Sequence, residues 1–330
     1  SPTRESVARG LAAKRSRKMQ ALVLVGGKGT RLRPLTTETP KPILPLVDRP
    51  FLSFMIEWLA NHGVDDIIFA CGFLPDQLEA VLGEGEPGGP RLRYLAEPDP
   101  RGTAGGIKFA EDLLDDTFFA LNGDVLTDLD LTWLWADHKR TGARASLGLY
   151  PVDDTSAFGL VDHDEYGEVL AFREKVPDRT EPGLINAGTY VLEKSVLDMV
   201  PAGQDVSIET EVFPRLVGDG LFCTELNGYW MDIGTPERYL DASWDILEGR
   251  VHTTVAADSE GLLVSPEAVV APDAKIGPRA VIREGCVVGA GATVSGSVLM
   301  PGCEIGAGAV IDNTICSPGV KVASGVRVGD

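Results

Sequence analysis

The stretch that decides the fold is residues 19–36, which read MQALVLVGGKGTRLRPLT. Within it, residues 21–25 form an uninterrupted apolar run of the kind that becomes a strand buried on both faces of a parallel sheet. The run leads directly into GGKGT at 26–30, where glycines allow backbone N–H groups to approach and wrap a polyphosphate. This stretch predicts an α/β domain whose first strand ends in a phosphate-binding loop.

Beyond this stretch, short apolar runs and amphipathic segments alternate as far as about Leu247. Such alternation is typical of the strands and crossover helices of an α/β sheet. We expect Gly63 to cap the first helix. The predicted elements are further strands at 66–70, 117–121 and 145–150, and helices at 51–62 and 105–114. The pattern therefore predicts a Rossmann-like domain with a mixed, mostly parallel sheet.

A second sequence pattern begins after about Val255, where branched apolar residues recur every six positions with small residues between them. The count slips by one before Leu299 and once more before Val322. The series contains Val264, Val270, Ile276, Ile282, Val288, Val294, Leu299, Ile305, Ile311, Val322 and Val328. One inward apolar residue per six predicts a triangular parallel β-helix with three hexads per coil and roughly four coils. A glycine-rich linker would not keep this phase.

Composition and charge restrict the function. The 330 residues carry a net charge of −19, although residues 1–18 hold six Lys or Arg against one acidic residue. An acidic body argues against a nucleic-acid partner, because phosphate backbones require clustered Lys and Arg. No apolar run approaches the roughly 20 residues that span a bilayer, no secretory signal is visible, and the five cysteines form no CxxC pair. We therefore expect a cytoplasmic protein without a membrane partner, and a tag, a loose arm or a misassigned start at 1–18.

The glycine loop departs from two familiar phosphate motifs. The dinucleotide fingerprint GxGxxG lacks its third glycine, since Leu32 stands at that position, and GxxxxGK[ST] is absent. The loop instead continues to Arg31, whose guanidinium can add a charge-assisted fork to a phosphate, and PKP follows at 40–42. Together, GGKGTRLRPLT and this PKP resemble the N-terminal signature of the sugar-1-phosphate nucleotidyltransferases. This family joins a nucleoside triphosphate to a sugar 1-phosphate and releases pyrophosphate.

The resemblance implies roles for the loop residues and a division of the chain. It assigns Arg31 and Lys41 to the triphosphate and the reacting phosphates. The implied domains are a basic extension or tag at 1–18, a nucleotidyltransferase catalytic domain at 19–250, and a hexapeptide-repeat left-handed β-helix at 251–330. The nucleotide-binding residues that it implies are Leu24, Gly26, Gly27, Gly29, Thr30, Arg31, Glu97, Gly102 and Thr103.

Two aspartates provide the metal ligands that the resemblance implies. Asp124 follows an apolar strand in NGD at 122–124, at the carboxyl edge where open α/β sheets bind ligands, and Asp232 lies in WMDIGT at 230–235. They match the family's NGD and WxDxGT motifs, whose aspartates jointly hold the catalytic magnesium. Mg²⁺ usually takes one or two carboxylates plus phosphate oxygens and water, so two aspartates suffice. The attacking sugar phosphate is already an anion, and a general base is not needed.

The sugar site is implied by FREK at 172–175 and NAG at 186–188, which resemble the family's FxEK and NAG motifs. Glu174 would accept hydrogen bonds from sugar hydroxyls, and Lys175 would act catalytically by contacting the sugar phosphate and the α-phosphate. Asn186 and the backbone at Gly159 would complete the site, and Gly123 is assigned to it as well. The family usually has proline directly after the lysine, whereas a valine intervenes here.

Base choice depends on the segment EPDPRGTAGG at 97–106. Guanine presents N1–H and N2–H₂ together, and an acceptor-only carboxylate complements both donors, so Glu97 favours GTP. GTAG at 102–105 also resembles the guanylyltransferase branch of the family, although Arg101 replaces the usual leucine. Glu97 could instead cap the helix that starts near Gly102, where the helix dipole would stabilise its charge.

These motifs together predict a mannose-1-phosphate guanylyltransferase, which makes GDP-mannose by Mg²⁺-dependent in-line attack on the α-phosphate of GTP. A heptose-1-phosphate guanylyltransferase and a glucose-1-phosphate uridylyl-, thymidylyl- or adenylyltransferase remain alternatives. Hydroxyl configuration is read by pocket geometry, which the sequence does not give.

Two functions of another class are disfavoured. A hexad-repeat acyltransferase generally uses a histidine within or beside the coils, and the last histidine, His252, precedes the first hexad. A non-catalytic nucleotide-sugar sensor tends to lose its charged catalytic residues. The five that the resemblance implies are all present here, namely Arg31, Lys41, Asp124, Lys175 and Asp232. Val and Ile on a flat face or open end of the β-helix predict a homodimer or a larger assembly.

Overall fold

The computed structural model describes residues 19–27, 29–72, 75–173, 181–258 and 260–329. The chain forms two compact units. The first, here called the sheet unit, contains Ser1–Gly27 and Met55–Trp230, and the second, the β-helix unit, contains Lys28–Phe54 and Met231–Asp330. The segment with Arg31 and Lys41 therefore shares a unit with the C-terminal repeats. None of the described helices is long and apolar enough to cross a membrane.

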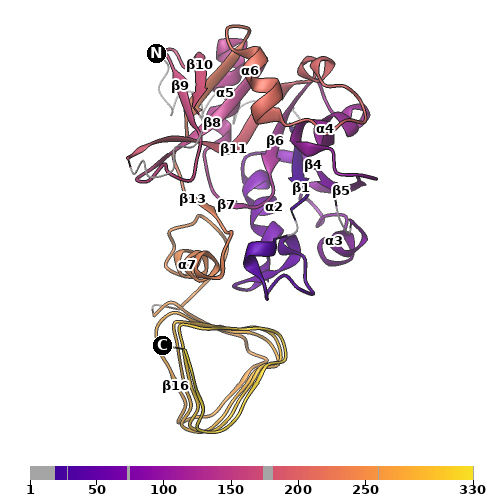
Figure 1. The fold of residues 1–330 in the computed structure, drawn as a ribbon. Coiled ribbons are helices and arrows are strands. Elements are labelled where there is room, and N and C mark those ends of the chain that lie inside the picture. The colour runs from indigo at the N-terminus through magenta and orange to yellow at the C-terminus, as the bar shows by residue number, and fades with distance from the viewer. Residues whose placement is uncertain (1–18, 28, 73–74, 174–180, 259, 330) are drawn as a thin grey trace. The chain divides into compact units, whose positions relative to one another are not determined.

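The sheet unit is built on one nine-stranded sheet (Figure 1). Its strands are β1 (Met19–Val25), β4 (Val64–Cys71), β5 (Arg91–Ala96), β6 (Thr117–Asn122), β8 (Ala145–Val152), β9 (Leu160–His163), β10 (Val169–Arg173), β11 (Gly183–Glu193) and β12 (Leu221–Glu225). Strand β1 lies between β4 and β6 and pairs with both in parallel, whereas β11 runs antiparallel to β6 and β8. The predicted strands and the Rossmann-like mixed sheet are confirmed.

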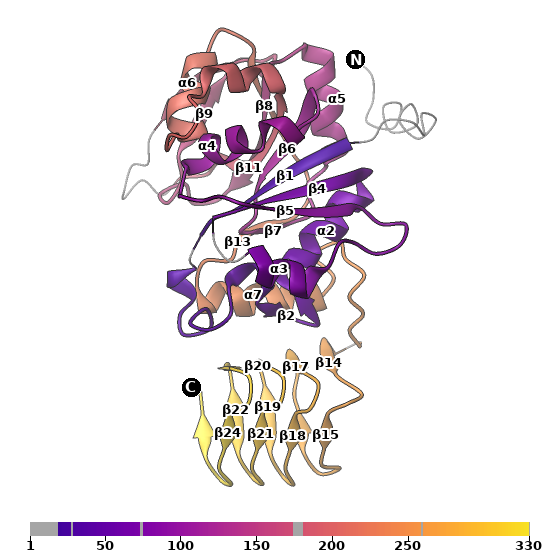
Figure 2. The ribbon, with the colours of Figure 1, turned by 90° about the vertical axis from the view of Figure 1, so that its right-hand side faces the viewer.

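Helices flank this sheet. They are α2 (Phe51–Asn61), α3 (Pro75–Leu82), α4 (Gly102–Phe109), α5 (Leu131–Thr141) and α6 (Phe213–Leu216), with short turns η3 (Glu111–Leu113), η4 (Lys194–Met199) and η5 (Ile208–Val212) and strand β7 (Val125–Thr127). Figure 2 shows α4 and α6 on one face of the sheet and α3 on the other. The core between sheet and helices contains Leu22, Phe118, Tyr190 and Phe213, all fully buried.

One predicted helix differs from the structure. The helix at 51–62 is confirmed, but the helix expected at 105–114 begins earlier, at Gly102, and ends at Phe109. It ends there because the Ala110 N–H bonds back to the carbonyls of Ile107 and Lys108, and the 3₁₀ turn η3 follows. The tighter turn replaces the last turn of helix that the periodicity predicted.

The C-terminal repeats form the predicted left-handed parallel β-helix, with three sheets of four parallel strands (Figure 2). The strands are β14 (Leu262–Val264), β15 (Val269–Val270), β16 (Lys275–Ile276), β17 (Ala280–Ile282), β18 (Val287–Val288), β19 (Thr293–Ser295), β20 (Ser297–Leu299), β21 (Glu304–Ile305), β22 (Val310–Asp312), β23 (Ile315–Cys316), β24 (Lys321–Val322) and β25 (Arg327–Val328). The predicted inward residues Ile282, Leu299 and Ile311 lie in the coil's buried core. Cys316 pairs with Leu299 and joins the same core, so it occupies the inward position at the second slip.

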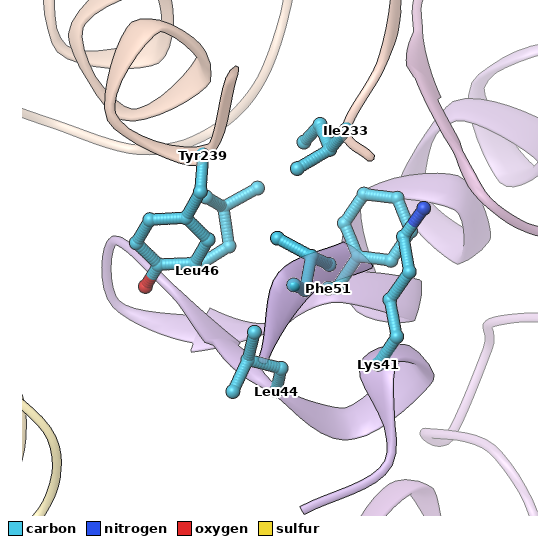
Figure 3. Close-up of a pocket in the computed structure, with 7 residues that line it drawn as sticks. Lys41, Leu44, Leu46, Phe51, Ile233 and Tyr239 are labelled. Atoms are coloured by element: carbon cyan, nitrogen blue, oxygen red, sulfur yellow. The ribbon is translucent and has the colours of Figure 1, made fainter. Parts of the chain in front are cut away.

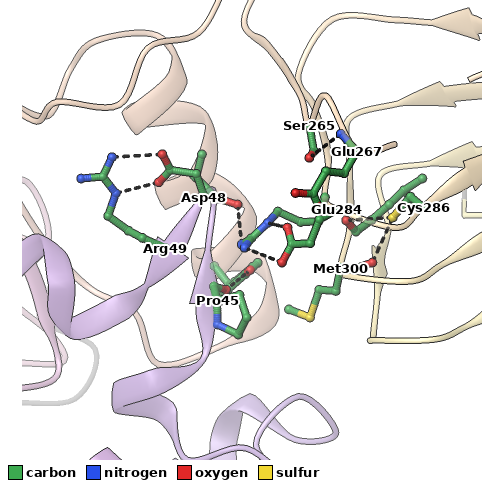
Figure 4. A network of polar contacts seen from close by, with 12 residues as sticks. Pro45, Asp48, Arg49, Ser265, Glu267, Glu284, Cys286 and Met300 are labelled. Carbon is green, nitrogen blue, oxygen red and sulfur yellow. Dashed lines mark hydrogen bonds and ion pairs between the residues drawn. The ribbon is translucent and has the colours of Figure 1, made fainter. Parts of the chain in front are cut away.

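The remaining part of the β-helix unit connects the coils to the loop that follows the first strand. It comprises η1 (Thr30–Leu32), η2 (Lys41–Ile43), the hairpin of β2 (Pro45–Leu46) and β3 (Arg49–Pro50), the end of β13 (Trp230–Asp232), and α7 (Pro236–Leu247). The Tyr239 hydroxyl on α7 donates to the carbonyl of Pro45. Arg283, on the coil, donates from Nη1 to the carbonyl of Val47 at 3.0 Å. Figure 4 shows the polar contacts in this region, with Pro45, Asp48 and Glu284 labelled. The hairpin is thus held by both α7 and the coil.

Candidate active site

Three of the predicted catalytic residues meet within the β-helix unit. The Arg31 Nη2 lies 3.7 Å from Asp232 Oδ2, and the Lys41 Nζ lies 4.0 Å from Asp232 Oδ1. Gly234 makes room for this arrangement, because a Cβ there would lie 3.0 Å from the Arg31 guanidinium carbon. Two cations and one carboxylate leave a local excess of positive charge in an otherwise acidic protein, as a triphosphate site requires.

The side chain of Lys41 packs against apolar side chains. Its side chain is only 10% exposed, against 69% for Arg31, and its Nζ lies 5.5 Å from the centroid of the Phe51 ring. The apolar pocket around it is lined by Leu32, Leu44, Leu46, Phe51, Ile233 and Tyr239 (Figure 3). Because packing already holds the apolar part of this side chain, little further conformational entropy is lost when the ammonium binds a phosphate.

Asp232 has the property expected of a metal ligand. Its Oδ1 is buried and has no hydrogen-bond partner within the described part of the chain. The Lys41 ammonium, 4.0 Å away, is too distant for a hydrogen bond, so this oxygen keeps an acceptor position that a metal ion can fill. Among the described residues no group of three or more His, Cys, Asp or Glu could hold a metal ion. A carboxylate oxygen is the kind of ligand that a hard divalent cation prefers, and such an ion can take its other ligands from phosphate and water.

In the sheet unit, the predicted nucleotide residues Leu24 and Glu97 converge on helix α4. A Cβ at Gly106 would lie 2.9 Å from Glu97 Oε1 and 3.4 Å from Leu24 Cδ2, so the helix needs glycine where these side chains approach. Burial raises the pKa of the Glu97 carboxyl, while the Arg101 guanidinium and the Arg101 backbone N–H oppose that rise. Glu97 therefore interacts with Arg101, the residue before α4, and also lies against the glycine face of the helix at Gly106. Both predicted roles, binding the base and capping the helix, agree with this position.

Thr103 and Asn186 are both held by hydrogen bonds to residues that the sequence did not single out. The Thr103 hydroxyl donates to Glu209 Oε2 at 2.8 Å, and Asn186 Nδ2 donates to the Tyr190 hydroxyl at 2.9 Å. Trp230 contacts the same part of β11, because its indole N–H donates to the carbonyl of Ala187 at 2.9 Å. Trp230 belongs to the segment WMDIGT at 230–235, so the sequence offered a signal for it. The role of Glu209 is visible only in its contact with Thr103, which lies about 100 residues away in the chain.

The other predicted site residues are placed as follows. Gly26 and Gly27 follow β1, Gly29 and Thr30 begin η1, and Gly102 opens α4. The Gly123 N–H donates to the carbonyl of Leu24 at 2.9 Å, Asp124 is exposed at the carboxyl end of β6, and Gly159 precedes β9. Glu174 and Lys175 lie outside the described residues.

Family models match both parts of the chain. The Nucleotidyl transferase model matches residues 20–249, and the GMPPB C-terminal domain model matches residues 259–330. The chain therefore belongs to the nucleotidyl transferase family and is an enzyme of that class. Nucleotidyltransferases of this family generally use a divalent metal, which agrees with an Asp232 oxygen that accepts no hydrogen bond within the described residues.

Relatives with named activities narrow the comparison. The chain is 39% identical to the mannose-1-phosphate guanylyltransferase of Mycobacterium tuberculosis, over 85% of this chain and 79% of that one. It is 38% identical to the probable mannose-1-phosphate guanylyltransferase 1 of Oryza sativa subsp. japonica, over 86% and 81%. Among solved structures, HddC from Yersinia pseudotuberculosis complexed with GMP-PN superposes with a TM-score of 0.58 at 28% identity, covering 69% of this chain and 99% of that one.

Proposed function

We propose that this enzyme is a mannose-1-phosphate guanylyltransferase, which converts GTP and mannose 1-phosphate to GDP-mannose and pyrophosphate with Mg²⁺. The observation that carries the reaction is the cluster of Arg31, Lys41 and the half-satisfied Asp232. The names of the relatives support the choice of mannose 1-phosphate and GTP. Glu97 supports guanine independently, because its carboxylate can accept from N1–H and N2–H₂ together.

The reaction is an in-line displacement at the α-phosphorus of GTP. An oxygen of mannose 1-phosphate forms the new bond to that phosphorus, and the bond from the α-phosphorus to the bridging oxygen breaks, so pyrophosphate leaves with the electron pair. Lys41 and Arg31 neutralise charge on the triphosphate as it separates from the α-phosphorus. A magnesium ion bound by Asp232, and by Asp124 as the sequence predicts, would reduce the repulsion between the two phosphates.

The direct test is pyrophosphate release in parallel reactions that contain Mg²⁺, mannose 1-phosphate and one of GTP, UTP, dTTP, ATP or CTP. We expect release with GTP. Release with UTP or dTTP instead would keep the reaction class and refute the role of Glu97. Silence with every nucleotide, repeated with glucose 1-phosphate and heptose 1-phosphate, would favour a non-catalytic nucleotide-sugar sensor.

Glu97→Gln sharpens the same test. Glutamine keeps the shape but replaces one acceptor by an NH₂ donor, which opposes the two donors of guanine. We expect kcat/KM for GTP to fall about 10²-fold relative to that for UTP. The matched control is Glu111→Gln on the following turn, where the carboxylate pairs with Lys108 at 2.7 Å. If the ratio of kcat/KM for GTP to that for UTP is unchanged in Glu97→Gln, Glu97 does not determine the choice of base.

We also propose that the enzyme is a homodimer or larger, assembled through the β-helix, and that it is cytoplasmic. Val269 and Val287 stand in register on neighbouring strands and are 64% and 44% exposed. Adjacent exposed valines on a flat sheet face support association. Light scattering during size-exclusion chromatography tests it, and a monomer would contradict it.

A further inference from the structure

A chain of hydrogen bonds connects two predicted subsites of the sheet unit. It starts at Asn186, whose Nδ2 donates to the Tyr190 hydroxyl at 2.9 Å, and Tyr190 in turn donates to Glu209 Oε1 at 3.2 Å. From the other side, the Thr103 hydroxyl donates to Glu209 Oε2 at 2.8 Å. The chain thus runs from β11 through η5 to the start of α4, and neither Tyr190 nor Glu209 belongs to a predicted site.

The direction of every bond in this chain is fixed. Thr103 Oγ1 accepts from the Ile208 N–H at 2.7 Å, which leaves its own proton for Glu209. The Asn186 amide cannot flip, because its Oδ1 accepts from the Gly188 N–H at 2.9 Å. The chain is partly buried and its protons have one hydrogen-bonded assignment, so the loss of one bond leaves the next residue without a partner.

Tyr190 is the buried centre of this chain. Its side chain is fully buried, and its ring packs edge-on against Phe213 with centroids 5.0 Å apart. Burial, and then the charge of Glu209, raise the pKa of the Tyr190 phenol far above its usual value, so the hydroxyl remains a donor at every physiological pH.

The two ends of the chain lie in different subsites under the proposed function. Thr103 follows Gly102 at the start of α4, three residues before the glycine face that Glu97 and Leu24 approach, and this is the predicted nucleotide subsite. Asn186 lies in β11 next to Ala187, whose carbonyl accepts from the Trp230 indole, and this is the predicted sugar subsite. The hydrogen-bonded chain is therefore a physical connection between them.

We propose that Glu209 and Tyr190 are positioning residues that couple nucleotide binding at Thr103 to sugar 1-phosphate binding at Asn186. This inference rests on the proposed function. A nucleotide that contacts Thr103 restrains the motion of a chain that is already formed, from Thr103 through Glu209 and Tyr190 to the Asn186 amide, so the sugar then binds at a lower cost in conformational entropy. Because linkage is reciprocal, each ligand tightens the other by the same factor.

The test is calorimetric. Mannose 1-phosphate is titrated into the full chain with Mg²⁺, with and without a GTP analogue whose α,β-bridging oxygen is a methylene group, so that pyrophosphate cannot leave. We expect the analogue to lower the Kd of mannose 1-phosphate about tenfold in the wild type, within the usual range of coupling between sites. In Tyr190→Phe, which loses both bonds but keeps the ring, the factor should fall to about one.

Two comparisons separate coupling from stability. Thr103→Ser keeps the hydroxyl and should keep the coupling, whereas Thr103→Val should lose it. Glu193→Gln lies on the same strand as Tyr190 and removes a carboxylate that accepts from Thr117 and Lys139 at 2.9 and 2.8 Å, so it matches the loss of a hydrogen-bonded acid elsewhere. It should lower the melting temperature and leave the coupling factor unchanged.

The outcomes distinguish this inference from the proposed function. A wild type that releases no pyrophosphate from GTP and mannose 1-phosphate overturns both. An active wild type without coupling, or a Tyr190→Phe variant that melts cooperatively and keeps the tenfold factor, overturns the coupling alone. Loss of the factor in Tyr190→Phe and Thr103→Val, together with its retention in Thr103→Ser and Glu193→Gln, supports it.

Discussion

Two groups of predicted site residues are held by different kinds of interaction. In the β-helix unit, Lys41 stands over Phe51 in an apolar pocket, and its hairpin is fixed by bonds to backbone carbonyls. In the sheet unit, Thr103 and Asn186 are held by a continuous chain of side-chain hydrogen bonds through Glu209. Apolar packing is non-directional and fixes a position, whereas the polar chain fixes an orientation and passes it on.

The difference suggests how the two groups respond to substitution. A cavity under Lys41 should reduce stability strongly and activity as a consequence. A break in the polar chain should cost less stability, because a single hydrogen bond contributes about 1 kcal/mol net, and should appear in the relation between the two substrates. The predictions below test this contrast, from the largest expected effect to the smallest.

The largest effect is expected from the acids. Asp232→Asn removes the negative charge beside Arg31 and Lys41, and we expect kcat to fall about 10³-fold with Mg²⁺, as when a group that stabilises transition-state charge is removed. Asp124→Asn should abolish turnover in the same way while the melting temperature stays within a few degrees. Pyrophosphate release measures both variants.

The control for the acids is Asp245→Asn. Asp245 lies on α7 in the same unit as Asp232, and its carboxylate pairs with Arg250 at 2.6 Å. Its substitution should leave kcat within about threefold of the wild type, because a partly exposed ion pair contributes about 1 kcal/mol or less. Magnesium-dependent turnover at the wild-type rate in Asp124→Asn or Asp232→Asn would refute the metal assignment for that residue.

The second effect is on the apolar support of Lys41. Phe51→Ala should cost about 3–5 kcal/mol of stability, because the buried ring lines the pocket under Lys41 and leaves a cavity when removed. Thermal melting measures the loss, and Val81→Ala on α3, where the valine is 50% exposed, is the control with little expected change. If Tyr190→Phe destabilises the protein as much as Phe51→Ala does, the contrast between the two regions fails.

Sequence reasoning predicted the parts of the fold that depend on local repetition. Strand β1 follows from an uninterrupted apolar run, and the inward positions of the coils follow from a period of six residues. The helical spacing at 105–114 misplaced both ends of α4, although a helix start near Gly102 was expected, because the apolar pattern begins three residues into the helix and continues into the 3₁₀ turn after Phe109. Strand β11 was missed because an antiparallel strand inserted beside β6 is specified by contacts far apart in the chain.

The candidate site divides in the same way. Arg31, Lys41 and Asp232 were predicted through resemblance to a family, and their proximity involves residues about 200 positions apart that no local pattern relates. Tyr190 and Glu209 were missed for a different reason. A tyrosine within a strand is an ordinary core residue and a glutamate after a serine an ordinary helix start, so their roles depend on partners that only the fold brings together.

The third effect concerns how the β-helix supports the hairpin next to Lys41. Arg283→Met removes the bond to the carbonyl of Val47, and we expect a stability loss of about 1–2 kcal/mol with a several-fold lower kcat. Arg279→Met is the matched control, because its guanidinium is 49% exposed and pairs with Glu248 instead. Equal kcat in both variants would mean that the hairpin is held by packing and by Tyr239 alone.

The smallest expected effect is a pH dependence of stability that arises from His138, Ser146 and Glu193, a polar cluster outside the predicted subsites. His138 donates or accepts between Ser146 at 2.8 Å and Glu193 at 3.0 Å, and burial lowers its pKa despite the bond to Glu193. The unfolded chain therefore binds a proton near the ordinary histidine pKa of about 6.5, where the folded chain does not. This contribution to stability is complete above that pH and is lost as the pH falls through the lower pKa of the folded state.

Melting temperatures test this expectation, because between pH 8 and pH 5 they should decline more steeply in the wild type than in His138→Gln. The factor by which the GTP analogue lowers the Kd of mannose 1-phosphate should be the same in both proteins at pH 8. A wild-type curve with the slope of His138→Gln would show that His138 titrates alike in both states. A changed coupling factor would show that this cluster also acts on the site, and that the distinction between the polar groups at the two ends of β11 is wrong.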